Sequence, residues 1–557
     1  MLKRQLALAF VMGIVFSVAP ATSARAQPGA SAPDVGPRPV TCPADAIVVK
    51  AGTSIQTAMD AAGPRASLCI ERGIYRPTVP LEPQSGQVLT FEKGAIVSGA
   101  QVVMSWNKRG AYWVLSNQTQ DFSDPSRFPF LNTYRCTDNP AACVYEDLFM
   151  DDKPMTHVLA LSDLGPGKVY FDKAADLMYI VDDPTGHTME TTRLTIGLDS
   201  TVSDVTIRGA TFEKFAWIGL RATGNSWTLE DDAFVDSHLV GLRLSGDDHV
   251  VRRDAIEHNG DIGIVATEGS GMLFHSNEVA FNNYLHFGAR PIPNEEGGAK
   301  FLITPDTTLR GNFSHDNDGD GWWFDTNNTN ILIEGNTFAD NARYGLFYEV
   351  SFDATIRNNT FRSNGIDFGL TQHWVGGGIR ISTSKNVDIY DNLFQDNRWS
   401  SLFASWVDRE AGAYGVPTTT ELHVHDNTFD MVGGFVGSSE GKPDIGLASS
   451  DNRFDNNTYH VTDVSSQWWR WPIDGSFQAM NWDTWRGLGF DVSGSLSQSQ
   501  SPPASGSPPG GGSTPTGPAA AHGTLAITLS VAAAVMIVLG VVTYGVLRRR
   551  RARASRS

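Results

Sequence analysis

Polar and apolar positions recur along the middle of the chain in a fixed pattern. Each copy has Asn or Asp, an apolar residue two positions later and Asn three positions further on, with one end replaced in some copies. Most copies follow one another after 22 to 25 residues, whereas a helical hairpin repeat needs about 33 or more. The copies begin at Ala210, Asp232, Asp254, Asn277, Asn312, Asn336, Asn359, Asn392, Asn427 and Asn452.

Short β-rich runs, such as residues 206–207, 331–333 and 387–389, lie within these units. The leucine signature of leucine-rich repeats, which share the period, is missing. The period and the short strands therefore predict an all-β fold, a parallel β-helix in which each unit is one coil and the next coil lies about 4.8 Å above it. The recurrent Asn should stack as a ladder of side-chain amides at one corner.

A glycine sets the register of one strand in each coil. Residues after it alternate, so the first and third side chains point inward and the second and fourth point outward. The inward set is apolar, as a packed core requires. The first outward column is Arg221, Arg243, Val265, Lys300, Trp323, Phe347, Arg380 and Phe403, and the second is Thr223, Ser245, Thr267, Leu302, Asp325, Glu349, Ser382 and Ser405.

Three insertions interrupt the repeat beside these columns, at residues 283–297, 365–377 and 406–417. The first two leave the same corner of the coil, and the third leaves the far end of the equivalent strand. We expect them to form walls on both sides of the strand. Sugars stack on aromatic rings and bond to planar polar groups, so four wall residues are candidates for substrate binding: His286, His373, Trp374 and Trp406.

Segments outside the repeat complete the exported body. A short helix after Ser54 should plug the open end of the first coil. The region rich in Tyr, Phe and turns should be an inserted antiparallel β lobe. A Trp cluster after the last coil should close the core. A sugar-binding role for that cluster is the alternative. The predicted boundaries are 27–100 for the cap and first coils, 101–200 for the lobe, 201–463 for the repeats and 464–492 for the C-terminal cap.

Both ends of the chain carry targeting features. Residues 1–26 resemble a secretory signal, with Lys3 and Arg4 before an apolar stretch and a small-residue cleavage site. A Ser/Pro/Gly-rich linker, 493–523, precedes an uncharged apolar span, 524–547, and an Arg-rich tail, 548–557. This order predicts a body outside the cell, anchored by a single C-terminal transmembrane helix with a cytoplasmic tail. A sortase signal is the alternative, but the segment at Ser513 departs from its Leu-Pro-x-Thr-Gly pattern.

The net charge of the chain restricts the kinds of molecule that it can bind. The formal net charge of −18 argues against nucleic acid, and a monomer is expected.

The four cysteines lie in the exported part, where disulfides form. Local pairs of Cys42 with Cys69 and of Cys136 with Cys143 are one arrangement, and free buried thiols are the other.

The repeat region resembles the bacterial right-handed parallel β-helix repeat proteins of the pectate-lyase-like superfamily. The segments that carry the likeness begin at Gly298, Ser314, Gly321, Asn336, Tyr348, Ala354 and Gly378. The resemblance covers about residues 45–490 and implies the fold. The superfamily includes lyases, hydrolases, epimerases and adhesins, so it does not fix the activity. The Asp pairs and Gly-His-Gly of polygalacturonases and the motifs of pectate lyases are missing, and no catalytic residue carries over from either.

Two carboxylates in the second outward column form the candidate catalytic site. Asp325 and Glu349 lie on adjacent coils, about 5 Å apart, a separation typical of a retaining glycosidase pair. Repulsion between them should raise the pKa of one, as an acid catalyst needs. Trp323 and Phe347 of the first outward column flank the pair and are candidates for substrate binding. Two cations of that first column, Arg243 and Arg380, are candidates as well.

Three alternatives stay open for this constellation. The two acids are also candidate ligands for Ca²⁺, with Lys300 as the base that removes a sugar C5 proton, a division of labour that resembles β-helix polysaccharide lyases. The second alternative is purely structural: the two acids belong to a solvent-exposed column of stacked side chains, in which Lys300 simply pairs with Asp325. The third is an adhesive surface protein that binds a glycan without cleaving it. The favoured hypothesis is an enzyme that cleaves an extracellular polysaccharide.

Overall fold

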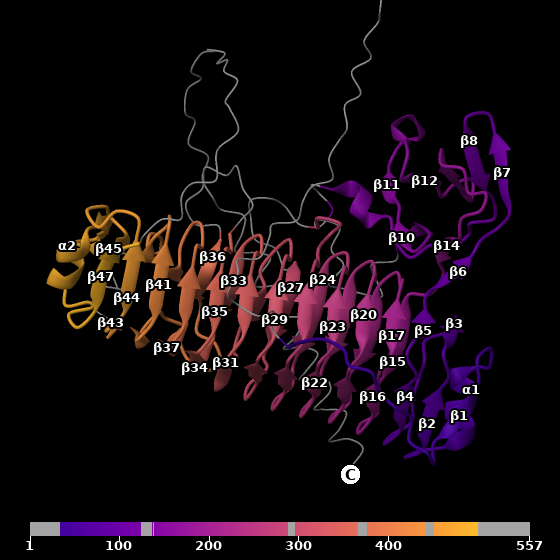
Figure 1. Cartoon of the computed structure of the whole chain (residues 1–557), viewed down its shortest axis with the longest axis horizontal. Coiled ribbons are helices and arrows are strands. Elements are labelled where there is room, and N and C mark those ends of the chain that lie inside the picture. The colour runs from indigo at the N-terminus through magenta and orange to yellow at the C-terminus, as the bar shows by residue number, and fades with distance from the viewer. Residues whose placement is uncertain are drawn as a thin grey trace, which may run out of the picture. The chain divides into compact units, whose positions relative to one another are not determined.

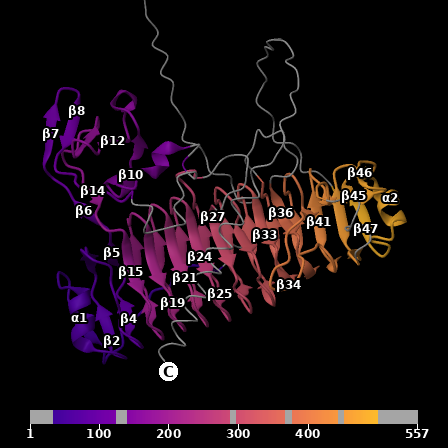
Figure 2. The ribbon, with the colours of Figure 1, turned by 180° about the vertical axis from the view of Figure 1, so that it is seen from behind.

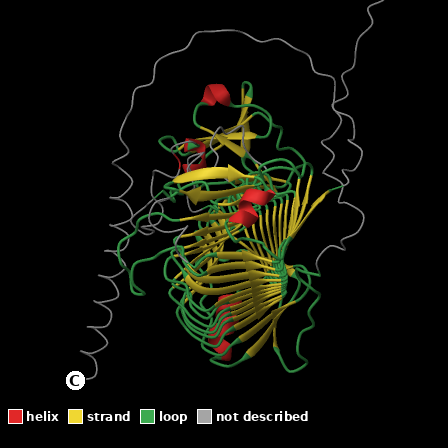
Figure 3. Ribbon diagram, turned by 90° about the vertical axis from the view of Figure 1, so that its left-hand side faces the viewer, coloured by secondary structure: helices red, strands yellow, loops and turns green. Residues whose placement is uncertain are grey.

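The computed structural model describes residues 34–123, 136, 139–287, 296–365, 376–441 and 451–499. Within them, the main body is a stack of coils in which each coil contributes one short strand to each of three parallel sheets, named here sheets A, B and C (Figure 1). Seen along the stack, the coils superimpose (Figure 3). The predicted parallel β-helix is therefore the observed architecture.

Sheets A and B each contain thirteen strands among the described residues. In stacking order, sheet A consists of β1 (Ile47–Val49), β2 (Ser67–Ile70), β4 (Val88–Phe91), β16 (Thr206–Arg208), β19 (Thr228–Glu230), β22 (Val250–Arg252), β25 (Leu273–His275), β28 (Thr308–Arg310), β31 (Ile331–Glu334), β34 (Phe352–Arg357), β37 (Lys385–Tyr390), β40 (Leu422–His425) and β43 (Arg453–Asp455). Sheet B consists of β3 (Gly73–Tyr75), β5 (Ala95–Ser98), β17 (Thr211–Glu213), β20 (Ala233–Val235), β23 (Ala255–Glu257), β26 (Glu278–Ala280), β29 (Phe313–His315), β32 (Thr337–Ala339), β35 (Thr360–Arg362), β38 (Leu393–Gln395), β41 (Thr428–Met431), β44 (Thr458–Val461) and β47 (Ser495–Gln498).

Sheet C carries the glycine-initiated strands and therefore both outward columns. Its strands in stacking order are β15 (Ile196–Ser200), β18 (Ile218–Ala222), β21 (Val240–Leu244), β24 (Ile262–Thr267), β27 (Gly297–Leu302), β30 (Trp322–Asp325), β33 (Tyr344–Glu349), β36 (Gly377–Ser382), β39 (Leu402–Ser405), β42 (Val436–Gly437), β45 (Trp469–Ile473) and β46 (Ser476–Met480). The last strand pairs antiparallel with β45.

The apolar position of the repeat forms a column of rings inside the coils. Neighbouring rings stack with centroids 4.6 to 5.0 Å apart along Phe338, Phe361, Phe394, Phe429 and Tyr459. All five side chains are buried. Because each ring lies over the one in the next coil, the repeat that defines the period also packs the core.

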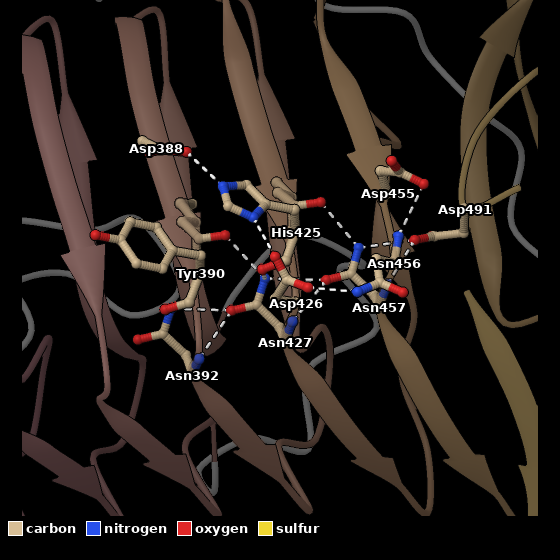
Figure 4. Close-up of polar contacts among 12 residues, drawn as sticks. Asp388, Tyr390, Asn392, His425, Asp426, Asn427, Asp455, Asn456, Asn457 and Asp491 are labelled. Atoms are coloured by element: carbon tan, nitrogen blue, oxygen red, sulfur yellow. Dashed lines mark hydrogen bonds and ion pairs between the residues drawn. The ribbon is translucent and has the colours of Figure 1, made fainter. Parts of the chain in front are cut away.

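The repeat produces two asparagine ladders instead of one. In the first ladder, each side-chain Nδ2 donates to the Oδ1 of the next Asn at 2.9 to 3.0 Å, from Asn277 through Asn312, Asn336, Asn359, Asn392 and Asn427 to Asn457. Figure 4 shows the last part of this ladder, from Asn392 to Asn457. The final Asn of the motif builds the second ladder, through Asn259, Asn282, Asn317, Asn341, Asn364 and Asn397. Asn452 does not continue the first ladder, since Asn457 takes that place.

A lobe of short strands projects from the first coils (Figure 2). Its two sheets are β10 (Lys153–Pro154), β9 (Leu148–Met150), β14 (Met189–Thr192) and β6 (Ala100–Val102), and β11 (Thr156–Val158), β12 (Lys168–Asp172), β13 (Leu177–Ile180), β8 (Tyr112–Leu115) and β7 (Trp106–Arg109). Among the described residues of the lobe there are also two 3-10 turns, Pro140–Cys143 and Leu161–Asp163.

Buried polar contacts hold the lobe on the coils. His238 Nδ1 lies 3.0 Å from both carboxylate oxygens of Asp147, and Lys214 Nζ donates to Glu190 Oε2 at 2.6 Å. The predicted lobe, 101–200, ends too late, because β15 at Ile196–Ser200 pairs with β18 of sheet C. That first strand of sheet C has no copy of the motif before it.

Helices lie at both ends of the stack. In α1 (Ile55–Ala62), the Ser54 side chain accepts a hydrogen bond from the Thr57 amide, and Ile55 and Met59 are buried. At the other end, α2 (Trp482–Gly487) contributes Trp485 to a buried cluster with Trp469 and Trp471.

Predicted features near the termini fall partly outside the description. Strand β47 pairs with β44 beyond residue 492, so the coil continues into the predicted linker. The signal, the rest of the linker, the apolar span 524–547 and the Arg tail lie outside the described residues. Across the described part, no helix has the length and apolar character needed to cross a membrane. Cys42 is disulfide-bonded to Cys69, and Cys136 to Cys143.

Candidate functional site

From Lys300 to Phe403, the first outward column of sheet C is a continuous stack of cations and rings, and this part is here named the cation–aromatic column. Its members pair in register from β27 to β39. Lys300 Nζ lies 3.6 Å from the ring centroid of Trp323, and the Trp323 and Phe347 rings stack at 4.9 Å. The Arg380 guanidinium then lies 4.9 Å from the Phe347 ring and 5.3 Å from the Phe403 ring.

The side chains of this column are packed against one another and are shielded from solvent. The side chains of Lys300, Trp323, Phe347, Arg380 and Phe403 are all buried. Each face of Trp323 and of Phe347 contacts a neighbour within the column, so neither ring presents a flat face for a sugar to stack on. Cations over aromatic faces stabilise each other best where water is excluded, and this contact makes the column a rigid floor for the residues beside it.

The second column brings Asp325 and Glu349 together, and we name these two residues the acid pair. They are register partners on β30 and β33. Asp325 Oδ2 lies 3.0 Å from Lys300 Nζ, and Asp325 Oδ1 accepts a hydrogen bond from the Thr326 hydroxyl at 2.8 Å. Glu349 Oε1 accepts from Arg409 Nη2 at 2.7 Å. Each acid therefore has its own cation.

The environments of the two acids differ. The Glu349 side chain is 11% exposed and that of Asp325 is 18% exposed. Burial raises the pKa of Glu349, repulsion from Asp325 adds to the rise, and Arg409, Arg380 and Lys300 oppose it. The pKa of Glu349 is therefore raised mainly by burial, whereas the sequence predicted a rise from the repulsion between the two acids alone.

Further ion pairs surround the acid pair. Arg380 Nη2 donates to Glu440 Oε1 at 2.5 Å, and Arg343 Nη2 lies 3.3 Å from Asp320 Oδ2. Burial raises the pKa of Asp320, which Arg343 opposes, and burial also raises the pKa of Tyr344 to about 12. The charges of this region form a buried, closely paired network rather than a solvent-exposed column of stacked side chains.

The other predicted binding residues are dispersed. Arg243 lies two coils before Lys300, and burial together with Arg221 lowers its pKa to about 10. His286 is well exposed, with Nδ1 2.5 Å from Asp318 Oδ2. Trp406 is half-buried and packs against the main core. His373 and Trp374 lie outside the described residues.

The acid pair does not fit the predicted calcium site. Ca²⁺ takes six to eight oxygen ligands, most of them carboxylate, carbonyl or water oxygens. Here two carboxylates contact two cationic side chains, so Ca²⁺ would have to displace both Lys300 and Arg409. Within the described residues, the one cluster of potential metal ligands is Cys42, Cys69 and Glu92, whose two cysteines are disulfide-bonded.

Several partners in this site were not foreseen. Arg409 lies in the insertion at 406–417 that was expected to form a wall, and Glu440 had no signal in the repeat, whereas Asp320 and Tyr344 were not predicted to belong to this site. Glu440 and Arg409 belong to segments that leave the coil after β42 and β39, where periodicity gives no register. Tyr344 could have been found, since it directly precedes the register glycine Gly345.

Comparison with known proteins agrees with this architecture. Residues 219–394 match the family described as "Right handed beta helix region". This match covers sheet C from β18 through β36, including the acid pair. The coils therefore form a right-handed parallel β-helix. No curated protein matches the chain.

Solved structures share the fold at low sequence identity. The complex of XylC with xylose has a TM-score of 0.52 and 14% identity, over 82% of this chain and 87% of that chain. The A-module of the mannuronan C-5 epimerase AlgE6 from Azotobacter vinelandii has a TM-score of 0.41 and 14% identity, over 81% of this chain and 94% of that one. At this identity the likeness to the XylC complex establishes the fold alone.

Proposed function

We propose that this protein is a carbohydrate-active enzyme that cleaves an extracellular polysaccharide along sheet C. The observation that supports it most is the acid pair, two carboxylates on adjacent coils in unequal environments. Two acids with separated pKa values are what glycoside hydrolysis requires. The β-helix fold shared with XylC, whose structure contains xylose, is consistent with a sugar as ligand.

In the proposed mechanism, Glu349 is the general acid and Asp325 the nucleophile. Glu349 carries the raised pKa and donates its proton to the glycosidic oxygen as the bond from that oxygen to the anomeric carbon breaks, while the Asp325 carboxylate attacks that carbon and forms a glycosyl ester. Water then attacks the anomeric carbon while Glu349, now ionised, accepts a proton from it, and the ester bond breaks to release the sugar and the Asp325 carboxylate. The strand spacing of about 4.8 Å suits a retaining pair. Lys300 orients Asp325 through their ion pair.

Lyase chemistry is less well supported. A lyase base must be deprotonated to remove the C5 proton of a uronate. Lys300 pairs with Asp325 at 3.0 Å and lies 3.6 Å from the Trp323 ring centroid. Both contacts stabilise the ammonium form, so they oppose the role of Lys300 as a base. We therefore favour hydrolysis.

A second candidate function is glycan binding without cleavage. The paired charges around the acid pair favour it, because Arg409 and Lys300 neutralise the carboxylates that catalysis would use. An adhesive protein needs only a shaped polar surface. This candidate predicts that glycans bind to the protein but that no product forms.

The location remains a proposal as well. We propose that the body is exported and anchored by the span 524–547, in line with the order of signal, linker, apolar span and Arg tail. Membrane fractionation of cells, followed by protease treatment of intact cells, tests it. Recovery of the uncleaved protein in the soluble fraction would contradict the anchor.

The function is tested by incubating the purified protein with a panel of neutral and uronate glycans. New reducing ends without ultraviolet absorbance indicate a hydrolase, and reducing ends with absorbance from unsaturated products indicate a lyase. Asp325→Asn and Glu349→Gln should each reduce turnover by about a thousandfold or more. Binding without any product, unchanged in both variants, would refute the enzymatic proposal and support the adhesive one.

A further inference from the structure

Two arginines and two aromatic rings line a pocket of about 230 Å³ on the C-terminal side of the cation–aromatic column. Arg398 and Trp399 directly precede the coil of β39, Gly434 and Phe435 directly precede β42, and Arg470 lies on β45. These segments come from three successive coils. The pocket is therefore a product of the stack and is not confined to one loop.

The pocket is continuous with the candidate site. Phe435 belongs to the same buried cluster as Trp323, Tyr344, Phe347 and Phe403, and its ring meets that of Phe403 edge-on at 5.9 Å. Register also links them, because Phe403 pairs with Gly437 and Gly437 with Arg470. Arg470 thus extends the first outward column, and Gly437 leaves one position of that column without a side chain.

The charges of the pocket differ from those around the acid pair. Arg380, Arg343 and Arg409 each contact a carboxylate. Among the described residues, neither Arg398 nor Arg470 forms an ion pair, and the guanidinium of Arg470 lies 4.6 Å from the Phe435 ring. Arg398 lies near enough to Asp340 to oppose the rise that burial causes in the pKa of that acid, but it makes no direct ion pair within the described residues, so both guanidinium groups keep donors for a ligand although the chain has a net charge of −18.

Trp399 supplies a surface that the cation–aromatic column lacks. It is half-buried and, within the described part of the chain, makes no contact with another aromatic ring. A partly exposed indole is suited to stack on the apolar face of a sugar. Guanidinium groups bind carboxylates through paired, charge-assisted hydrogen bonds.

We propose that Arg398, Trp399 and Arg470 form a subsite for a carboxylate-bearing sugar unit, in which Trp399 stacks on the ring and the arginines bind the carboxylate. The proposal deepens the proposed function by naming an acidic polysaccharide as its substrate class. Four coil steps separate β33 from β45, or about 19 Å at the spacing of parallel strands. A ligand that reaches both the acid pair and this pocket is therefore a chain of several sugars.

The test measures binding of three oligosaccharides to the full-length protein by titration calorimetry. Hexagalacturonate carries the carboxylates, its methyl ester removes their charge, and xylohexaose has none. Arg398→Gln combined with Arg470→Gln should weaken hexagalacturonate binding by about tenfold or more and leave the other two within about twofold. Trp399→Ala should weaken both galacturonate ligands. Arg109→Gln, an exposed arginine of the lobe, is the matched control and should change nothing.

Several outcomes would overturn the subsite. They are hexagalacturonate binding that is equal in the double variant and the wild type, equal weakening of all three ligands, and no hexagalacturonate binding by the wild type. If the double variant is unstable, Arg398→Gln alone gives the same comparison, since Arg398 is exposed. Product formation, monitored in parallel, separates the two proposals: cleavage of xylohexaose alone supports the enzyme without the subsite, and selective acid binding without cleavage supports the subsite without the enzyme.

Discussion

Arg409 reaches across 60 residues of sequence to donate a hydrogen bond to Glu349 at 2.7 Å. The arginine belongs to the inserted segment after β39, whereas the glutamate ends β33. The contact therefore connects a wall of the site to its floor. Because Arg409 opposes the effects of burial and of Asp325 on Glu349, it sets how firmly the proposed acid holds its proton.

Arg409→Gln should move the pH dependence of catalysis. Removal of the cation raises the pKa of Glu349 further, so the protonated acid persists to higher pH. The alkaline limb of kcat/KM against pH should therefore shift upward. Arg453→Gln, at an exposed arginine paired with Asp451, is the control. An unshifted alkaline limb would mean that Glu349 is not the acid.

The sequence predicted the floor of this site because both of its determinants are periodic. The glycines Gly321 and Gly345 fix where alternation begins, and alternation then places Asp325 and Glu349 in one outward column on adjacent coils. Sheet register needs only the hydrophobic pattern and the turn. The same logic gave the stacking of Asn336 on Asn359.

The residues that cover the floor were not predictable in this way. Arg409 and Glu440 lie in segments with no repeat, so their partners depend on tertiary packing. Outward side chains were expected to face solvent, yet Lys300 and Arg380 are buried. Lys300 pairs with Asp325 of the next strand, and Arg380 pairs with Glu440 of a segment beside sheet C. The ladder shows a related failure at Asn457, where an irregular spacing hid the true register.

Asp254→Asn should stabilise the protein at neutral pH. Asp254 is fully buried in the first ladder, where its Oδ1 accepts from the Asp232 amide and its Oδ2 has no hydrogen-bond partner among the described residues. Burial, and then Asp232, raises its pKa well above the usual range. An asparagine at this position carries no charge and can donate to Asn277, as Asn277 donates to Asn312.

The sign of this effect depends on pH. The folded-state pKa of Asp254 lies above the value of about 4 that it has in the unfolded chain. As pH rises from about 4 toward the folded-state pKa, the unfolded state loses its proton while the folded state keeps it. The free energy of unfolding therefore falls over this pH range. Asp254→Asn should remove this fall and raise stability by about 1 to 3 kcal/mol at pH 7. Calorimetric melting at pH 5 and pH 8 measures it. Asn336→Asp should lower the stability at neutral pH, because it places a carboxyl in the same ladder. Asp45→Asn, at an exposed position, is the control and should leave the stability unchanged. A lower melting temperature for Asp254→Asn than for the wild type at pH 8 would contradict the argument.

Breaking the pair of Lys300 and Asp325 should cost stability as well as turnover. The outward position of Asp325 suggested that its removal would leave the fold undisturbed, but Lys300 is buried and would lose a carboxylate 3.0 Å away. Asp325→Asn should destabilise by about 2 kcal/mol. Lys300→Met in the same chain should recover part of that loss, because it removes the charge left behind. Denaturant unfolding of the two single variants and the double variant gives the coupling energy.

The same variants distinguish the two chemical roles of Lys300. If the lysine positions Asp325 for attack, Lys300→Met should lower kcat by about tenfold to a hundredfold, and Lys300→Arg should restore much of it, since arginine keeps the ion pair. If the lysine is a lyase base, both variants should lose turnover by orders of magnitude, since the guanidinium does not deprotonate in proteins. The readout is single-turnover product formation on the best glycan of the panel, with Arg109→Gln as control. Equal and complete loss in both Lys300 variants, with ultraviolet-absorbing products from the wild type, would replace the hydrolase proposal by a lyase.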